Sequence, residues 1–127
     1  MSKTITMIFG WIFIILGIVG FFNNPILGIF AVDTIHNVIH LLSGIIFVWV
    51  AYSMPMKSMG LLKVFGIIYL LVALLGFFSS GMILGLVTVN GADNWLHVVL
   101  ALVFLWGGFM GGKSASASMP MGGQPQM

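Results

Sequence analysis

The sequence predicts an all-α fold: a polytopic membrane four-helix bundle built from a tandem repeat of two-span units. Three observations predict it. Hydrophobic residues make up 61% of the 127 residues and charged residues only 5%, whereas soluble domains carry about 25% charged residues. Four continuous apolar segments are long enough to cross a bilayer, and the second half of the chain repeats the pattern of the first.

The four expected spans cover about Ile5 to Phe22, Ile35 to Met54, Leu61 to Phe78, and Ala92 to Gly111. Each is close to the roughly 20 residues that a helix needs to cross the hydrocarbon layer. Pro25 and Pro55 follow the first two spans, where proline cannot continue a helix. We therefore expect a four-span domain over residues 1–111 and a disordered cytoplasmic tail over 112–127, which is rich in Gly, Ser, Pro and Gln.

The repeat is visible in register. Residues 28–49 match residues 85–106 at a constant offset of 57, which aligns Asn37 with Asn94 and His40 with His97. The preceding segments, 9–22 and 65–78, match at an offset of 56. We interpret the chain as two copies of a helix–loop–helix unit, repeat one over about 5–54 and repeat two over about 61–111. Small residues on the first and third spans predict close helix packing; they are Gly10, Gly17, Gly20, Gly66, Ala73 and Gly76.

Charge distribution predicts the orientation. All four lysines flank the spans on one side, and both aspartates lie near the loops on the other side. The positive-inside rule then places the N- and C-termini in the cytoplasm. We expect a multi-pass protein of the prokaryotic inner (cytoplasmic) membrane, with the lipid bilayer as its main partner. The apolar outer loops are expected to lie in the headgroup region.

The composition also excludes several functions. A chain with so few charges cannot cover a water-facing surface, so a soluble enzyme is excluded, and four scattered lysines make no nucleic-acid site. The absence of cysteine removes disulfides and thiolate sites. Because no nucleophile–base constellation, phosphate loop or pair of catalytic carboxylates is present, we expect no enzyme and no catalytic residues.

Polar residues at the start of the second and fourth spans are the candidates for a site. They recur at steps of three and four, which places them on one face of each helix. We expect His40 and His97 to approach each other about one turn below the outer surface, and His36 to be the counterpart of Asp93. The candidate residues are Asp33, His36, Asn37 and His40 on the second span and Asn90, Asp93, Asn94 and His97 on the fourth.

Three interpretations of these residues stay open. In the first, no cofactor is bound. Asp33 and Asn90 cap the helices, and the structural polar cluster of Asp33, Asn37, Asn90 and Asn94, with its histidines, links the repeats. In the second, a divalent metal is bound by His36, His40, Asp93 and His97, because histidines at i and i+4 point the same way. In the third, His40 and His97 are axial ligands of haem b, and small residues make room for the macrocycle; they are Gly17, Gly20, Gly44 and Gly76.

At residues 33–41 (DTIHNVIHL) and 92–97 (ADNWLH) the chain resembles a known family. It is similar to small bacterial and archaeal four-span membrane proteins catalogued as domain of unknown function 4383, which share an Asn-x-x-His pattern opening the second and fourth spans. The resemblance covers roughly residues 5–111. It implies a four-span inner-membrane protein and marks Asn37, His40, Asn94 and His97 as characteristic positions, but it implies no activity.

The sequence therefore predicts a small integral membrane protein with a structural, accessory or interaction role. The paired Asn and His residues near the outer face would link the repeats. The alternative is a metal- or haem-binding redox or transport component that uses His40 and His97. We expect a homo-oligomer or a larger membrane complex as its assembly, and no nucleic-acid partner.

Overall fold

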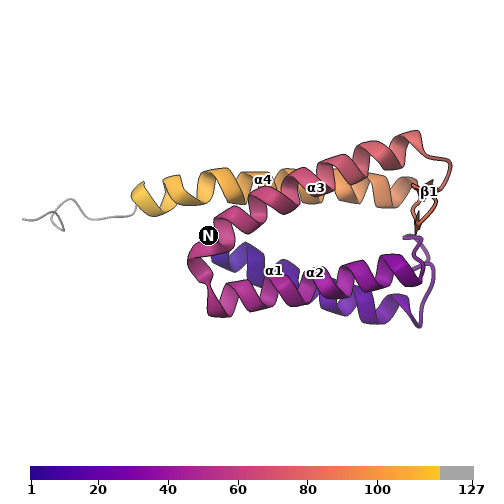
Figure 1. The fold of residues 1–127 in the computed structure, drawn as a ribbon, viewed down its shortest axis with the longest axis horizontal. Helices are drawn as coiled ribbons and strands as arrows, with labels where there is room; N and C mark the ends of the chain where they lie inside the picture. Colours follow the sequence, from indigo (N-terminus) through magenta and orange to yellow (C-terminus); the bar gives the residue numbers. More distant parts are fainter. Residues whose placement is uncertain (118–127) are drawn as a thin grey trace, which may run out of the picture.

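The computed structural model describes residues 1–117, with side chains described through residue 111, and contains four long helices. These are α1 (Ser2–Gly20), α2 (Thr34–Ser53), α3 (Ser58–Phe78) and α4 (Gly91–Ala117). A short 3-10 turn, η1 (Pro55–Lys57), joins α2 to α3, and an antiparallel hairpin of β1 (Met82–Ile83) and β2 (Val87–Thr88) precedes α4. Figure 1 shows these elements along the chain.

The four helices confirm the four expected spans. Each is long and apolar enough to cross a membrane, over Ser2–Gly20, Thr34–Ser53, Pro55–Phe78 and Gly91–Gly111. One boundary needs correction: α4 continues through residues 112–117, which were expected to begin the disordered tail. Alanine has the highest helix propensity and serine is compatible with a helix, so a helix already formed can extend through these residues. The remainder of the expected tail, 118–127, lies outside the described residues.

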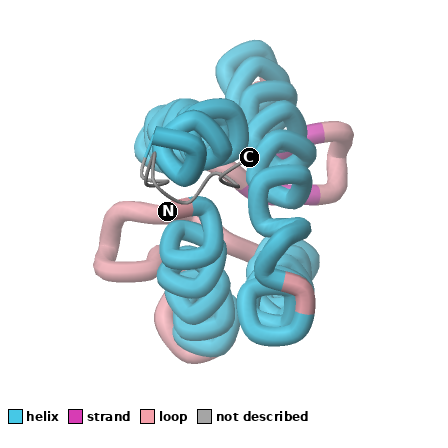
Figure 2. Tube along the Cα trace, turned by 90° about the vertical axis from the view of Figure 1, so that its left-hand side faces the viewer, coloured by secondary structure: helices cyan, strands magenta, loops and turns pink. Residues whose placement is uncertain are grey.

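The helices pack as two hairpins, α1 with α2 and α3 with α4, and the hairpins join to form the bundle. Figure 2, along the long axis, shows the four helices side by side. The predicted small residues lie at the contacts within each hairpin. A Cβ at Gly10 would lie 2.8 Å from Val48, and one at Gly66 would lie 2.7 Å from Leu105. Because no side chain separates the backbones, the helices approach closely and gain van der Waals contact.

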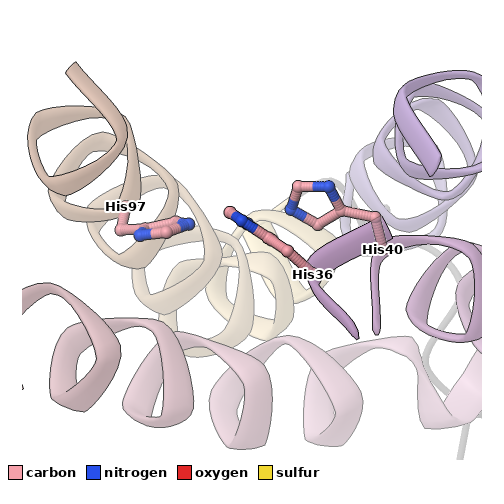
Figure 3. A group of neighbouring side chains, drawn as sticks. All are labelled: His36, His40 and His97. Atoms are coloured by element: carbon pink, nitrogen blue, oxygen red, sulfur yellow. The ribbon is translucent and has the colours of Figure 1, made fainter. Parts of the chain in front are cut away.

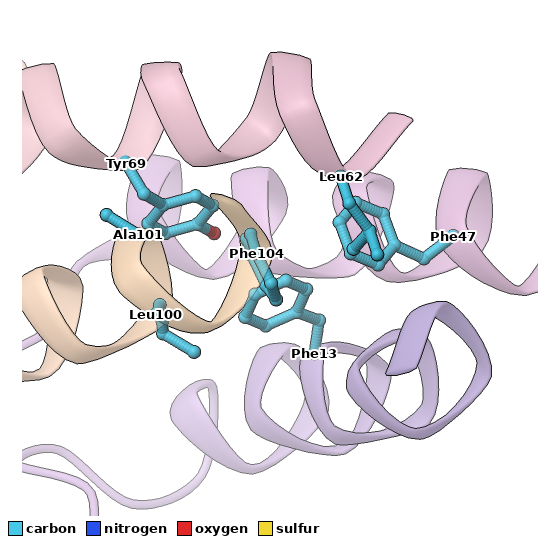
Figure 4. Close-up of a cluster of buried hydrophobic side chains, with 7 residues drawn as sticks. All are labelled: Phe13, Phe47, Leu62, Tyr69, Leu100, Ala101 and Phe104. Atoms are coloured by element: carbon cyan, nitrogen blue, oxygen red, sulfur yellow. The ribbon is translucent and has the colours of Figure 1, made fainter. Parts of the chain in front are cut away.

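The core between the hairpins is aromatic (Figure 4). Phe13 of α1 stacks on Tyr69 of α3 with ring centroids 5.7 Å apart, and Phe47 of α2 lies 5.4 Å from Phe104 of α4. Phe13 and Tyr69 are aligned by the offset of 56, and Phe47 and Phe104 by the offset of 57. The two halves therefore meet through equivalent positions, as expected for helices related by an axis along the bundle.

The loop between α1 and α2 (residues 21–33) and the loop between α3 and α4 (residues 79–90) make the same tight turn. We call them the first and the second outer loop. Leu27 and Gly28 have φ angles of 54° and 71°, and Leu84 and Gly85 have φ angles of 52° and 68°. In both loops the residue after this pair donates an N–H to the carbonyl of the residue before it, at 3.0 Å in the first and 2.9 Å in the second. Two successive positive φ angles define a type I′ turn. These matching turns support the interpretation of the chain as a repeat.

Charged residues separate along the bundle as the sequence predicts. The start of α1, η1 and the far end of α4 lie at one end, and the hairpin β1–β2 lies at the other (Figure 1). Lys3, Lys57 and Lys63 belong to the first end. Asp33 and Asp93 belong to the second, where each begins a helix. We call the second end the outer end, following the orientation that the lysines predict.

Candidate functional site

Helices α2 and α4 begin with equivalent caps at the outer end. Asp33 precedes α2, and its Oδ1 accepts the N–H of His36 at 2.8 Å. Asn90 precedes α4, and its Oδ1 accepts the N–H of Asp93 at 2.9 Å. Asp93 Oδ2 accepts the N–H of Asn90 in return, at 2.8 Å, which completes a capping box. The predicted N-caps are therefore confirmed, and they fix the direction in which the first turn of each helix presents its side chains.

The carboxylates also connect the two halves. Thr88, in the second loop, donates its N–H to Asp33 Oδ2 at 2.7 Å, and Ala31, in the first loop, donates its N–H to Asp93 Oδ2 at 3.1 Å. Ala31 and Thr88 are equivalent at the offset of 57. Asn90 adds a third bond, from its Nδ2 to the carbonyl of Ile29 at 2.7 Å. Each loop is thus held by the helix start of the other half.

These bonds set the charge of Asp33, which lies outside the spans. Burial alone would raise its pKa, but the hydrogen bonds from His36 and Thr88 favour the carboxylate more strongly and hold the pKa below its usual value of 3.8. Asp33 is therefore ionised at neutral pH. A negative charge at this position also interacts favourably with the N-terminus of α2.

Three histidines meet directly beneath the loops (Figure 3). His36 and His40 come from α2 and His97 comes from α4, and all three side chains are buried. One ring nitrogen from each lies within 4.8 Å of the others. The ring centroids of His36 and His40 are 4.4 Å apart, as expected for i and i+4 positions, and those of His36 and His97 are 6.0 Å apart. The expected approach of His40 to His97 is thus present.

The tautomer of His36 is fixed by its partner. His36 Nδ1 lies 2.9 Å from the carbonyl oxygen of Thr88. Since a carbonyl only accepts, Nδ1 must carry the proton, and the lone pair of a neutral ring is then on Nε2. An outer carbonyl that holds one ring nitrogen while the other faces inward is the usual arrangement of a metal-binding histidine.

His40 and His97 are each held by an aromatic side chain of their own hairpin. The ring of His40 stacks on Phe13 at 5.7 Å, and the ring of His97 lies 5.4 Å from Tyr69. In both histidines Nδ1 is buried and has no hydrogen-bond partner among the described residues. A buried nitrogen without a hydrogen-bond partner lowers the stability of the folded protein, so a ligand that binds these nitrogens would recover that free energy.

A family model describes this chain. It is a domain of unknown function, DUF4383, and it matches residues 3–110. The chain belongs to this family. Neither a search of curated proteins nor a search of solved structures gave a significant match. The match extends over all four spans, and the DUF4383 domain therefore contains both hairpins and the three histidines.

In this DUF4383 protein the asparagines of the Asn-x-x-His motifs contact their own hairpins. A Cβ at Gly20 would overlap Asn37 Oδ1, and a Cβ at Gly76 would overlap Asn94 Oδ1. Within the part of the chain that the structure describes, neither oxygen has a hydrogen-bond partner. The expectation that these asparagines link the repeats needs correction. Among the described residues, the hydrogen bonds that join the halves at the outer end come from Asp33, Asn90 and Asp93, and from His36 through Thr88.

Asp93 is placed differently from the other three expected metal ligands. It is buried, but none of its oxygens belongs to the group that lies within 4.8 Å. Its Oδ2 accepts the N–H groups of Asn90 and Ala31, so this oxygen serves the cap and the opposite loop. Among the described residues, the metal-ligand group consists of His36, His40 and His97.

The haem interpretation fits the packing poorly. Gly17 and Gly44 were expected to leave space for a macrocycle, but a Cβ at Gly17 would lie 2.9 Å from the backbone of Asn37, and one at Gly44 would lie 2.7 Å from Ile14. Gly20 and Gly76 contact asparagine side chains. The neighbouring helix therefore occupies the space beside each of these glycines.

Sequence reasoning missed two contributors to the site. Thr88 acts through its backbone N–H and carbonyl, which no residue type reveals. Tyr69 contacts His97 from α3, a helix without other polar residues near this depth. One signal was available for Tyr69: it replaces Phe13 in the repeat alignment, and a hydroxyl in an otherwise apolar span indicates a polar environment.

Proposed function

We propose that this protein is a multi-pass membrane protein that binds a divalent transition metal, Zn²⁺ or a metal of similar preference, through His36, His40 and His97. The observation that carries the proposal is the convergence of three buried ring nitrogens within 4.8 Å. Neutral imidazoles are good ligands for such metals, and three protein ligands leave a fourth position open.

The geometry requires a small adjustment. Zinc–nitrogen bonds of about 2.0–2.1 Å in a tetrahedral site place the nitrogens about 3.3 Å apart. The rings therefore need to move together by roughly 1–1.5 Å relative to the 4.8 Å group. His36 is already oriented by the Thr88 carbonyl, so His40 and His97 are the rings that move. Binding would give these two histidines the interaction that they lack.

The test is zinc binding by protein purified without a polyhistidine tag. Elemental analysis and calorimetry should give one zinc per chain, and each single change, His36→Ala, His40→Ala or His97→Ala, should weaken binding about 100-fold. The loss is large because removing one of three ligands leaves a two-ligand site.

The chain has three histidines, and all belong to this cluster. Independent adventitious binding would therefore fall only in proportion to the number of histidines, and that result would contradict the proposal. Asn23→Ala is the matched control, because Asn23 is an exposed polar residue at the same end. It should bind zinc as the unchanged protein does.

A structural or accessory role is the second candidate. It is favoured by the bonds that cross between the halves, from Thr88 to Asp33 and from Ala31 to Asp93. In this role the outer end would lock the bundle, and the His40→Ala, His97→Ala double variant would lose thermal stability in detergent even without metal. Equal stability of the metal-free double variant and the metal-free unchanged protein would contradict a locking role for the histidines.

The proposed setting is the inner membrane, with both termini in the cytoplasm. It is supported by the lysines at one end of the bundle and the aspartates at the other. The metal site would then face the outside. Cysteine labelling at Lys3 and at Asn23, both of which are exposed, should report opposite sides of the membrane.

A further inference from the structure

A cavity of about 200 Å³ lies beside the histidine cluster and is not explained by metal binding. Its walls come from α2, α3, the hairpin β1–β2 and one residue of α4. Most of the lining is apolar, from residues such as Ile39, Ile68 and Val72. The three histidines, Ser43 and Tyr69 form its polar part.

The cavity lies on the side where α2 faces α3. These helices belong to different hairpins and contact each other much less than the partners within a hairpin do. Ile39 and Ile68, one on each helix, line the cavity and are both 43% exposed on the outer surface of the bundle. Since that surface faces acyl chains in a membrane, a ligand would enter from the lipid.

The lining predicts a neutral ligand. None of the described residues that line this cavity is a lysine or an aspartate, so a charged molecule would lose its hydration without an opposite charge to replace it. An apolar ligand with no hydrogen-bonding group is also a poor match. His40 and His97 are more than nine-tenths buried, and each has an unpartnered ring nitrogen.

The volume of the cavity and the aromatic side chains in its wall favour a ligand with one aromatic ring. An engineered cavity of about 150 Å³ lined by apolar side chains binds benzene, and this cavity is slightly larger at about 200 Å³. Phe65 and Tyr69 belong to its wall. Aromatic side chains favour an aromatic guest through edge-to-face or offset contacts.

We propose that this cavity binds a neutral, lipid-soluble molecule with one aromatic ring and one hydroxyl group, that is, a simple phenol. The ring lies among Ile39, Ile68 and Val72, and the hydroxyl faces the histidines, Tyr69 and Ser43. A hydroxyl both donates and accepts, so it pairs with imidazole nitrogens and with side-chain hydroxyls. The site does not depend on a bound metal, and its test is made on metal-free protein.

The experiment measures ¹⁹F NMR shifts of three probes with the full chain in detergent after chelation: 4-fluorophenol, fluorobenzene and 4-fluorobenzoate. Empty micelles give the background partitioning of each probe. We expect saturable binding of 4-fluorophenol at least tenfold tighter than that of fluorobenzene, and no saturable binding of 4-fluorobenzoate. Equal affinity for 4-fluorophenol and fluorobenzene would overturn the role of the polar wall.

Two variants test whether 4-fluorophenol binds in the cavity. Ile68→Trp fills the cavity and should weaken 4-fluorophenol binding at least tenfold. Its matched control is Ile67→Trp, because Ile67 is the neighbouring lipid-facing residue, is 53% exposed and does not line the cavity. If Ile68→Trp binds the probe as Ile67→Trp does, the cavity is not the binding site.

Two further variants test the polar wall without removing a histidine. Tyr69→Phe and Ser43→Ala together should weaken 4-fluorophenol binding several-fold and leave fluorobenzene unchanged. Zinc binding is measured on the same proteins. Loss of phenol binding in Ile68→Trp with one zinc retained supports two separate properties, whereas phenol binding in a protein that binds no zinc supports the cavity and contradicts only the metal site.

Discussion

The outer ends of the two halves have the same framework but carry different groups at one equivalent position. In both halves a tight turn with two positive φ angles leads to a capped helix, and the cap oxygen accepts the N–H three residues later. That third residue is His36 in the first half and Asp93 in the second. The difference determines what each half contributes to the site.

The comparison shows why the first half can place a histidine in the cluster at a position where the second half has an aspartate. Each half needs one carboxylate to accept an N–H from the opposite loop. In the second half this carboxylate is Asp93, which lies inside the helix, whereas in the first half it is the cap itself, Asp33. Asp33 both caps its helix and accepts the N–H from the opposite loop. The residue at position 36 is therefore not needed for either bond and can be a histidine. Its ring turns inward to the other two imidazoles.

The largest effect is expected from making the first half resemble the second at this position. His36→Gln keeps a residue that is favoured at the third position of a helix and removes the imidazole. Zinc affinity should fall about 100-fold in calorimetry, which corresponds to roughly 2.7 kcal/mol. The melting temperature of the metal-free protein should fall modestly, because the hydrogen bond from His36 to the Thr88 carbonyl is lost. Retained zinc affinity would show that His40 and His97 bind metal without the third ring.

The next effect tests whether the two hairpins are equivalent. Gly20→Ala and Gly76→Ala would each place a Cβ against an asparagine amide, so each should cost about 1–3 kcal/mol of stability in detergent. Gly60→Ala is the control. No described atom lies within 4 Å of the Cβ that this change adds, and alanine favours the helix, so stability should rise by up to about 1 kcal/mol. Destabilisation by only one of the first two variants would break the equivalence.

A smaller effect is expected from Asp33, the carboxylate that caps α2. Asp33→Asn removes a half-buried charge that accepts two N–H groups, and it should cost about 1 kcal/mol at neutral pH. Since the pKa of Asp33 is lowered in the folded protein, its carboxylate stabilises fully above the usual value of 3.8. That contribution is lost as the pH falls through the lower folded pKa.

Thermal unfolding in detergent between pH 7 and pH 3 measures this contribution. The unchanged protein should lose stability below about pH 4, and the loss should be smaller in Asp33→Asn. An identical pH dependence of the two proteins would contradict the assignment to Asp33.

The smallest effect concerns the turns. Leu27 and Leu84 adopt positive φ angles, which leucine disfavours and asparagine tolerates. Leu27→Asn and Leu84→Asn should each raise stability in detergent by about 0.5–1 kcal/mol. Both leucines are largely exposed, at 74% and 78%, so the same changes should weaken membrane contact of the loops. Destabilisation in detergent would show that these leucines pack within the protein.

Much of the fold could be predicted from sequence because only helices and closed β-barrels can cross a bilayer. Apolar length alone placed all four helices, and Gly10 and Gly66 indicated which faces approach closely. The histidine cluster was also predictable: i and i+4 spacing places His36 beside His40, and the repeat alignment pairs His40 with His97.

The remaining features depend on groups that residue types do not show. The partners of Asp33 and Asp93 are backbone N–H groups of Thr88 and Ala31, whose positions are set by the loop turns. Asp93 therefore could not be distinguished from a metal ligand by spacing alone. The cavity forms between α2 and α3, and its walls depend on how two separate hairpins pack against each other.

The exchange of loop bonds between the halves has a consequence for assembly. A hairpin alone would leave a carboxylate and an N–H donor without partners near the membrane surface, where such groups are costly. Each hairpin therefore requires the other to complete its own end. Cleaved at the short linker around η1, the two fragments would re-associate in the bilayer as a complementary pair.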